Sequence, residues 1–153
     1  MHVEIRTATV GDAPSLGVLR GQAIEAACSD TYDRQEYAEL VVNPMGEIES
    51  WINDDATTVL VAENEITPVA YAVLDEPAGE IRSIATSTDY QREGVGSAVL
   101  DRLLARAREI DLIELHATAP TVAVGFFEAQ GFDTGEEAEW YGLPARRLRT
   151  RIA

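Results

Sequence analysis

The sequence contains no lysine, one cysteine and two histidines among its 153 residues. The single cysteine, Cys28, excludes an internal disulfide and a cysteine-based metal cluster. The histidines, His2 and His116, are too few and too far apart to suggest a zinc site, so we expect no metal. No apolar run approaches the roughly 20 residues that cross a bilayer, and the first residues lack the basic and apolar regions of a signal peptide. We therefore expect a cytoplasmic protein that does not bind membranes.

Positive charge is also scarce. Arginine supplies all 12 basic residues against 27 acidic ones, which leaves a net charge of −15. A domain this acidic is a poor candidate for nucleic-acid binding, because contacts to phosphates need a basic surface. A GC-rich genome that favours arginine codons would explain the missing lysine. A halophile's cytoplasm, where salt screens repulsion between acidic groups, would explain both features, and their combination favours this second interpretation.

Hydrophobic periodicity predicts a single α+β domain over residues 1–153 around one mixed sheet. Alternating, β-rich segments predict strands at 2–8, 57–63, 68–76, 79–86, 111–117, 132–142 and 145–152. Helical spacing or composition predicts helices at about 13–28, 29–43, 45–55, 97–109 and 121–131. Asp12 is a candidate N-cap for the first helix, with Pro14 just inside it. The strand–helix–strand unit at 79–117 is where two strands can run parallel.

The stretch Gln-Arg-Glu-Gly-Val-Gly at 91–96 places two glycines between a strand and a helix. Glycine costs about 1 kcal/mol against alanine in a helix, so its use here requires a reason. The first-turn amides of a helix have no partner within it, and glycine lets a ligand approach the backbone closely. The pattern is therefore that of a tight turn or an anion site. It lacks the third glycine of a dinucleotide fingerprint, and the chain lacks the lysine of a P-loop.

The wider context of these glycines is more specific. Residues 80–109 resemble the acetyl-CoA-binding core of the GNAT N-acetyltransferase superfamily, whose motif Gln/Arg-x-x-Gly-x-Gly/Ala is matched by Gln91, Gly94 and Gly96. Residues 123–132, Ala-Val-Gly-Phe-Phe-Glu-Ala-Gln-Gly-Phe, resemble the family's fourth-helix motif. The order of predicted strands and helices is also similar along the whole chain.

This resemblance implies a mostly antiparallel sheet of about seven strands, flanked by about four helices, whose central parallel strands splay apart. It implies acetyl-CoA as co-substrate, with the pyrophosphate on the amides of the glycine loop and the pantetheine arm along the fourth strand. The residues that it assigns to acetyl-CoA are Ile84, Ala85, Thr86, Gln91, Arg92, Glu93, Gly94, Val95, Gly96, Ser97 and Phe127.

Acetyl transfer to an amine requires a base, because an ammonium group has no lone pair. Glu80 precedes Gly94 by 14 residues, the spacing of a catalytic glutamate in some members of the family, and we expect it to be the base. Strand alternation would place Glu80 on the same face as Arg82, Ile84 and Thr86. A backbone amide near Ile84 is expected to stabilise the oxyanion.

The residue that usually donates a proton in this family has no polar counterpart at the matching position of this sequence. Phe127 stands where the family usually has a tyrosine, and Val122 stands where it often has an asparagine. A thiol with a pKa of about 8.5 is a fair leaving group, so the acid is either dispensable or supplied by Tyr141 or Tyr90. His116 is expected to be a hydrogen-bonded strand residue.

The sequence therefore predicts an acetyl-CoA-dependent N-acetyltransferase that acts on a primary amine of a small molecule, protein or peptide. Two alternatives stay open: a transferase that uses a longer acyl-CoA, and a non-catalytic acyl-CoA-binding or regulatory module, which the apolar Phe127 and Val122 would suit. The basic run at 145–151 is expected to be a solvated face or a subunit contact, the latter consistent with a homodimer.

Salt adaptation makes a direct prediction about stability. At 0.01 M salt the Debye length is about 30 Å, whereas at 1 M it is about 3 Å. Repulsion within a chain of net charge −15 should therefore fall steeply between these conditions, and we expect the melting temperature to rise markedly from dilute buffer to molar potassium chloride. A melting temperature independent of salt would favour codon usage as the reason for the missing lysine.

Overall fold

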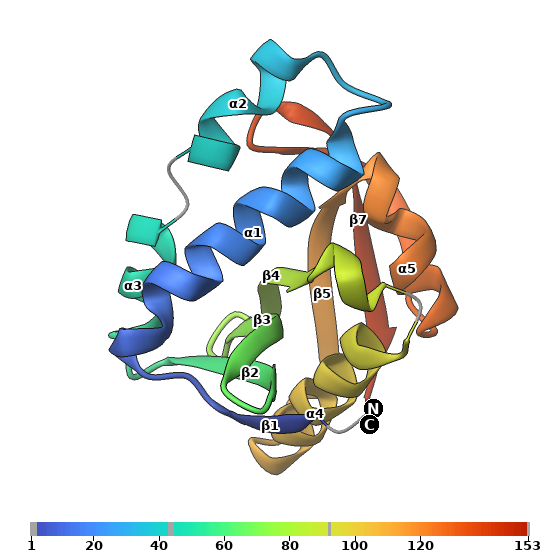
Figure 1. Ribbon diagram of the computed structural model, residues 1–153. Coiled ribbons are helices and arrows are strands. Elements are labelled where there is room, and N and C mark those ends of the chain that lie inside the picture. The colour runs from blue at the N-terminus through green and yellow to red at the C-terminus, as the bar shows by residue number, and fades with distance from the viewer. Residues whose placement is uncertain (1–2, 43–44, 92, 153) are drawn as a thin grey trace.

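The computed structural model describes residues 3–42, 45–91 and 93–152, and shows one seven-stranded sheet. The strands are β1 (Glu4–Thr7), β2 (Thr57–Asn64), β3 (Thr67–Asp75), β4 (Glu80–Thr86), β5 (Glu114–Pro120), β6 (Asp133–Trp140) and β7 (Leu143–Arg151). They are arranged in the order β1-β2-β3-β4-β5-β7-β6 (Figure 1). Neighbouring strands are antiparallel except β4 and β5, which run parallel. The mixed, mostly antiparallel sheet is as predicted.

Within the described residues, five α-helices connect the strands, one more than the roughly four that the family resemblance implied. They are α1 (Ala13–Cys28), α2 (Arg34–Val42), α3 (Met45–Ile52), α4 (Val95–Glu109) and α5 (Val124–Ala129). Short 3-10 turns lie at Val10–Asp12, Thr88–Tyr90 and Thr121–Ala123. The predicted order of strands and helices is confirmed throughout. Within the described residues, no helix is both long and apolar enough to cross a bilayer.

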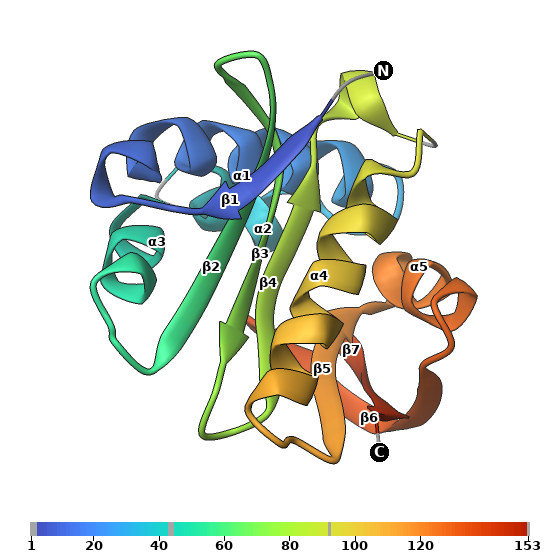
Figure 2. The same ribbon diagram turned by 90° about the horizontal axis from the view of Figure 1, so that it is seen from below.

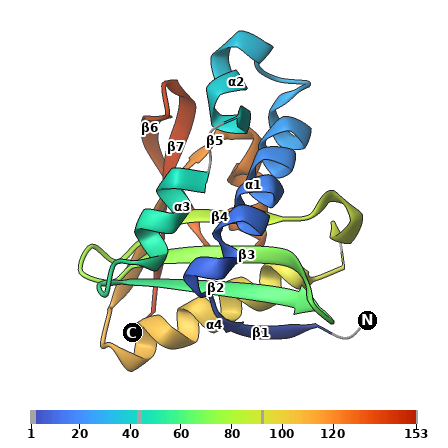
Figure 3. The same ribbon diagram turned by 60° about the vertical axis from the view of Figure 1, so that its left-hand side comes forward.

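The helices cover both faces of the sheet. Helices α1 and α3 lie on one face of β2–β4, and α4 lies on the other (Figures 2 and 3). One core cluster joins the sheet to α1 and α3 through residues such as Leu16, Ile48 and Tyr71. A second joins it to α4 and α5 through Leu100 and Phe127. Both faces of the sheet carry apolar side chains, which would be exposed to water without helices on each side. A layer of helices on both faces therefore follows from the distribution of apolar residues in the strands.

The sheet opens in its middle. Strand β4 pairs with β5 at Glu80–His116 and Ile81–Ala117, and the two strands then separate. On its other edge β4 stays paired with β3 as far as Thr86. The opening is therefore confined to one seam, as the family resemblance implied, and it exposes one edge of β4 to ligands.

A β-bulge in β4 corrects the expected orientation of its side chains. Val73 pairs with Ser83 and Leu74 with Ile81, so Arg82 is an extra residue. Alternation is therefore broken. Glu80 faces α3, whereas Ile84 packs in the core beside α4. The prediction that Glu80, Arg82, Ile84 and Thr86 share a face is wrong, because a period of two holds only within an unbroken ladder.

Two further local predictions differ from the structure. Strand β5 begins at Glu114 instead of residue 111, because Asp111 has φ of +63° in the turn that follows α4. Asp12 does occupy the N-cap position of α1, but its side chain makes no capping hydrogen bond to that helix. Its carboxylate accepts from the Thr9 amide at 2.7 Å and from Arg6 instead.

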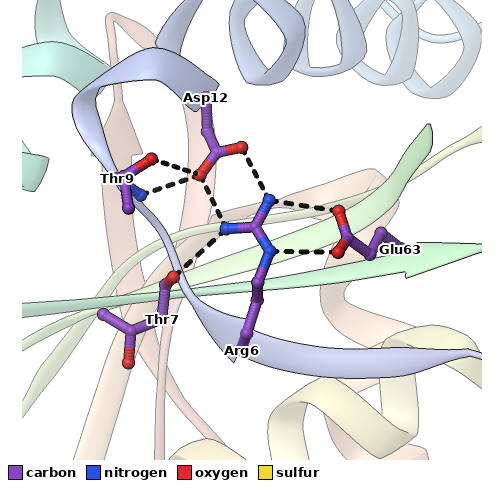
Figure 4. Close-up of polar contacts among 5 residues, drawn as sticks. All are labelled: Arg6, Thr7, Thr9, Asp12 and Glu63. Atoms are coloured by element: carbon purple, nitrogen blue, oxygen red, sulfur yellow. Dashed lines mark hydrogen bonds and ion pairs between the residues drawn. The ribbon is translucent and has the colours of Figure 1, made fainter. Parts of the chain in front are cut away.

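Arg6 ties the edge strand β1 to its neighbours (Figure 4). Its Nη1 and Nη2 each lie 2.8 Å from an oxygen of Asp12, and its Nε and Nη2 each lie 3.1 Å from an oxygen of Glu63 on β2. The hydrogen bond from Arg6 is the main reason why the pKa of Asp12 falls from near 3.8 to about 2. The same contacts raise the pKa of Arg6, so both charges persist at neutral pH.

This network predicts a stability difference that depends on pH. The folded-state pKa of Asp12 is depressed, so its contribution is complete above about pH 4 and is lost as pH falls toward 2. We expect Asp12→Asn to reduce the free energy of unfolding by about 1–2 kcal/mol at pH 7, since Arg6 is partly exposed to solvent and screening weakens the pair. The measurement is urea unfolding of both proteins from pH 7 to pH 2.

The control is Glu109→Gln, which alters an exposed carboxylate 3.6 Å from Arg106 and should change stability little at any of these pH values. A constant difference between Asp12→Asn and the unchanged protein down to pH 2 would contradict the role of the ionised carboxylate.

Candidate active site

A cleft of about 250 Å³ lies where β4 and β5 separate. We call it the β4–β5 cleft; helices α1 and α5 and the residues just before α5 complete its walls. Its lining residues are Arg20, Ala23, Ile24, Ala27, Cys28, Tyr71, Ile81, Ser83, Ile84, Ala85, Thr86, Gln91, Ala119, Pro120, Val122, Ala123, Phe126, Phe127 and Trp140. Most of these are apolar, and the polar members gather at two ends.

The glycine loop adjoins one end of the cleft, where Gln91 is a lining residue and Gly96 packs against the lining residues Thr86 and Phe126. Gly94 is the N-cap of α4 with φ of +80°, a conformation that favours glycine. Gln91 donates from its Nε2 to the Thr86 carbonyl oxygen at 3.1 Å, which holds the loop against the end of β4. As the N-cap residue, Gly94 makes no side-chain hydrogen bond to the first amides of the helix. The first amides of this 15-residue helix are therefore available to an anion, which the helix dipole would also attract.

Gly96 is required for close packing rather than for an unusual φ. A Cβ at this position would lie 2.9 Å from Thr86 Oγ1 and 3.4 Å from Phe126 Cε1. The absence of a side chain thus lets the first turn of α4 approach both β4 and α5. Ser97, next along the helix, accepts from Gln130 Nε2 at 2.8 Å, which fixes the same turn to the end of α5.

A buried arginine marks the other end of the cleft. Arg20 of α1 is 3% exposed. Its Nη1 donates to Glu47 Oε1 at 2.7 Å, and its Nη2 donates to Tyr141 Oη at 2.9 Å. Its guanidinium also lies 5.4 Å from the ring centres of Trp51 and Tyr141, within cation–π range. Arg20 thereby joins α1, α3 and the turn between β6 and β7 beside the cleft.

A second cavity, of about 560 Å³, lies next to the first and shares Ile81 and Trp140 with it. We call it the acidic cavity. It is lined by five carboxylate residues and one arginine: Glu47, Asp54, Asp75, Glu80, Glu139 and Arg82. Its other lining residues are Ser50, Trp51, Thr57, Ile81, Thr118, Trp140 and Tyr141. The excess of negative charge suits a cationic ligand.

Glu80 lies in the wall of the acidic cavity, in the first of the two residue pairs that join β4 to β5. Its Oε1 is 2.7 Å from Arg82 Nη1, and its Oε2 is 3.6 Å from His116 Nδ1. His116 Nε2 lies 2.9 Å from the Ala78 carbonyl oxygen, so this histidine is the hydrogen-bonded strand residue that we expected. Glu80 is thus held at the mouth of the splay by neighbours on two strands.

The structure divides the predicted site residues between the two cavities. Ile84, Ala85, Thr86, Gln91 and Phe127 line the β4–β5 cleft. The described loop residues Glu93, Gly94, Val95, Gly96 and Ser97 do not line the cleft themselves. Gly96 packs against its lining residues Thr86 and Phe126, and the Val95 side chain is buried in the core. Arg92 lies outside the described residues. Glu80 and Tyr141 line the acidic cavity instead.

Tyr141 has φ of +50°, which is uncommon for a large residue and holds its ring toward Arg20. Its Oη donates to Glu47 Oε1 at 2.6 Å. Burial, together with this hydrogen bond, raises the pKa of Tyr141. The phenol therefore keeps its proton, which is directed at Glu47 in this arrangement.

Three polar residues of the cleft were not predicted from the sequence: Arg20, Tyr71 and Ser83. Arg20 does carry a signal, because it lies four residues from both Leu16 and Ile24 on the apolar stripe of α1. Tyr71 and Ser83 form a hydrogen bond of 2.7 Å across neighbouring strands. Their residue types alone do not indicate that pairing, since a tyrosine and a serine are ordinary strand residues.

Comparison with known proteins agrees with this geometry. The model of the Acetyltransferase (GNAT) family matches residues 23–132, which is more than half of the chain. The chain therefore belongs to the GNAT acetyltransferase family. No curated protein sequence matches it.

Solved structures share the fold at low sequence identity. A GCN5-related N-acetyltransferase from Rhodopseudomonas palustris is 20% identical, with a TM-score of 0.87 over 99% of this chain and 96% of that one. The PaiA N-acetyltransferase of Thermoplasma acidophilum, solved with coenzyme A, is 16% identical, with a TM-score of 0.75 over 99% of both chains. YncA of Salmonella typhimurium, a putative acetyltransferase solved with acetyl-CoA, is also 16% identical, with a TM-score of 0.75 over 100% of this chain and 95% of that one.

The packing of Gly96 predicts a compensating pair of substitutions. Gly96→Ala places a Cβ against Thr86 Oγ1, so we expect a loss of about 1–2 kcal/mol in the free energy of unfolding, after alanine's better helix propensity is counted. Adding Thr86→Ala removes the closest clash and should recover much of that loss. Urea unfolding of the single and double variants measures both effects.

Gly94→Ala is the matched control. A Cβ there meets open space among the described residues, but φ is +80°, so the variant should lose about 1–2 kcal/mol through backbone strain. Thr86→Ala should not recover this loss. Equal recovery in both backgrounds would show that the contact between residues 86 and 96 is not the cause.

Proposed function

We propose that this chain is an acetyl-CoA-dependent N-acetyltransferase that transfers an acetyl group to a primary amine. The observation that carries the proposal is the β4–β5 cleft, which runs from the glycine end of α4 to the acidic cavity that contains Glu80. An elongated co-substrate with an anionic end and a reactive end fits such a path. The family to which the chain belongs supports acyltransferase activity. The two cavities support transfer from a co-substrate in the β4–β5 cleft to an amine in the acidic cavity.

The residues in and beside the cleft suit two parts of coenzyme A, the pyrophosphate and the pantetheine arm. The uncapped first turn of α4 would hold the pyrophosphate through backbone amides. The edge of β4 from Ser83 to Thr86, beyond its pairing with β5, would pair with the amide groups of the pantetheine arm, as an added strand does. Two of the structural neighbours were solved with coenzyme A or acetyl-CoA, which is consistent with this use of the fold.

The acidic cavity suits the acceptor. A primary amine is a cation at neutral pH, and five carboxylates around this space would attract it. Trp51, Trp140 and Tyr141 add aromatic walls against which an alkyl chain or an ammonium group can lie. The cavity is therefore expected to bind the amine and to present it to Glu80.

The mechanism follows from the position of Glu80. Acetyl-CoA would supply an activated acyl carbon to which the amine nitrogen bonds while the carbon–sulfur bond breaks and its electron pair leaves with sulfur. Glu80 would accept one proton of the ammonium group, directly or through a water molecule, and the second N–H proton would pass to the departing thiolate after the carbon–nitrogen bond forms. A β4 amide near Ile84 would donate to the acyl oxygen as negative charge develops there. These groups lie along one strand, so the bulge at Arg82 sets their relative orientation.

Tyr141 is our proposed general acid if the leaving thiolate requires one. Its phenol lies on the acceptor side and is bonded to both Glu47 and Arg20. To protonate the departing sulfur it would have to leave these partners. A thiol with a pKa of about 8.5 leaves readily without help, and we therefore assign Tyr141 a secondary part in the reaction.

A binding module is the second candidate, because Phe127 and Val122 present apolar side chains to the cleft where the family usually has polar ones. Thiol release from acetyl-CoA, measured in molar potassium chloride with a panel of amines and peptide N-termini, separates the two. An enzyme releases thiol with at least one acceptor class, whereas a binding module gives a calorimetric signal with acetyl-CoA and no thiol. Absence of both signals would refute the proposal.

The base assignment predicts a pH-dependent defect. Glu80→Gln keeps the shape of the side chain but cannot take a proton, so we expect turnover to fall by about 10²–10⁴-fold at neutral pH. The deficit should shrink toward pH ~10, where a lysine-like amine deprotonates unaided. Steady-state rates from pH 6 to pH 10 with an acceptor from the panel measure this.

Glu109→Gln, at the far end of α4, is the control for loss of a carboxylate and should follow the unchanged protein at every pH. Unchanged turnover in Glu80→Gln across the range would remove Glu80 from the mechanism.

A further inference from the structure

A pair of hydroxyl groups is built into the wall of the β4–β5 cleft. Tyr71 of β3 has 0% exposure, yet its phenol oxygen lies 2.7 Å from Ser83 Oγ on β4, and both residues line the cleft. A phenol hydroxyl within an otherwise apolar core is costly unless it is hydrogen-bonded. Phenylalanine would fill the same space without that requirement, so the hydroxyl of Tyr71 calls for an explanation.

Ser83 is well placed to meet a reacting group. It is the first paired residue of β4 beyond the extra residue Arg82, and it directly precedes Ile84. Its side chain shares a face with Glu80, because it bonds Tyr71 in the core beneath α1 and α3. The bulge thus sets Ser83 on the acceptor side of β4 while the edge of the strand faces the cleft.

The polar residues of the cleft separate by position. Thr86 and Gln91 belong to the glycine end, where they bond one another. Arg20, Tyr71 and Ser83 belong to the opposite end, toward Ile81, which the cleft shares with the acidic cavity. In the proposed reaction the amine would arrive from the acidic cavity. The acyl end of a bound co-substrate would therefore lie at the junction of the two cavities.

Either hydroxyl of this pair can donate, and the neighbouring charge favours Tyr71 as the donor. The positive charge of Arg20 acts on the Tyr71 phenol, and a guanidinium carries donors only. The phenol oxygen is therefore best turned toward Arg20 and its proton toward Ser83. Burial raises the pKa of Tyr71 to about 12, so that proton is present at working pH. With the phenol as the donor, Ser83 Oγ accepts from Tyr71, and the Ser83 proton is free to point into the cleft.

We propose that Ser83 is a further catalytic residue, which donates a hydrogen bond to the carbonyl oxygen of the bound acyl group, and that Tyr71 is the positioning residue that orients it. This inference rests on the proposed function. It supplies a side-chain donor at a reacting end where Phe127 and Val122 are apolar. A donor fixed in an apolar wall stabilises developing oxyanion charge more than one in water does.

The test uses acetyl-CoA labelled with ¹³C at the acetyl carbonyl and infrared difference spectroscopy. In the unchanged protein the carbonyl band should shift to lower frequency than in free acetyl-CoA, because a hydrogen bond weakens the C=O bond. Ser83→Ala should lose part of this shift, and Ser83→Thr should retain it. Tyr71→Phe should broaden the carbonyl band or reduce its shift. Calorimetry should show nearly equal affinity of all variants for coenzyme A, which has no acyl group.

Two matched controls remove hydroxyls elsewhere in the fold. Thr58→Val deletes a strand hydroxyl bonded to Glu76, and Tyr32→Phe deletes a buried phenol bonded to Thr121 and the Pro144 carbonyl. Both should leave the carbonyl band where the unchanged protein has it. A purely structural effect would instead lower the melting temperature in variants and controls alike without a specific change in the band.

Kinetics supply the second readout. Ser83→Ala should lower kcat by about 10²-fold, with little change in KM for acetyl-CoA, as removal of an oxyanion donor does. Tyr71→Phe should lower it less, and the double variant should be no worse than Ser83→Ala, because Tyr71 acts through Ser83.

The outcomes are distinguishable. Failure of the unchanged protein to bind acetyl-CoA would overturn the proposed function and this inference together. Binding with the same carbonyl frequency in Ser83→Ala as in the unchanged protein would overturn the inference alone, as would additive losses of kcat in the double variant.

Discussion

The parting of β4 from β5 is the constraint on which the rest of the structure depends. A parallel pair that ends after two residue pairs leaves one strand edge without its neighbour. Such an edge is stable in a folded protein only if something covers it or a ligand pairs with it. Helix α1 on one side and α5 on the other enclose the space without filling it, and the cleft of about 250 Å³ results. Gly96 belongs to the same arrangement, because it lets α4 begin against the end of β4.

The β-bulge converts this opening into a site with two sides. With an unbroken ladder, Glu80 and Ile84 would share a face, and the carboxylate would enter the core beside α4. The extra residue Arg82 rotates the first part of the strand by one position. Glu80 and Ser83 then lie on the face toward α1 and α3, while Ile84 packs toward α4. The polar chemistry is thus separated from the hydrophobic packing within a seven-residue strand.

Local sequence signals were sufficient for the order of the elements and for the glycine loop, because periodicity, prolines and glycines act over a few residues. The position of the bulge could not be predicted from the sequence for a physical reason. It depends on the register between β3 and β4, and Arg82 is neither a glycine nor a proline that would mark it. The contacts of Arg20 were equally inaccessible, since Tyr141 lies 121 residues away and no local pattern links the two. The glycine turn before α4 was therefore predictable, whereas the contacts at the opposite end of the β4–β5 cleft were only partly so.

Charge is distributed in a way that reconciles an acidic chain with an anionic co-substrate. The net charge of −15 would repel coenzyme A if it were spread evenly. Among the described residues that line the β4–β5 cleft, however, Arg20 alone carries a formal charge, and it is positive. The five carboxylates nearby all line the adjoining acidic cavity, where a cationic amine would be held. Arg20 also bonds Glu47 at the boundary, so the charge there is locally balanced. In the proposed reaction the two cavities would therefore favour opposite charges, and an acyl donor and an amine would meet from opposite sides of one strand.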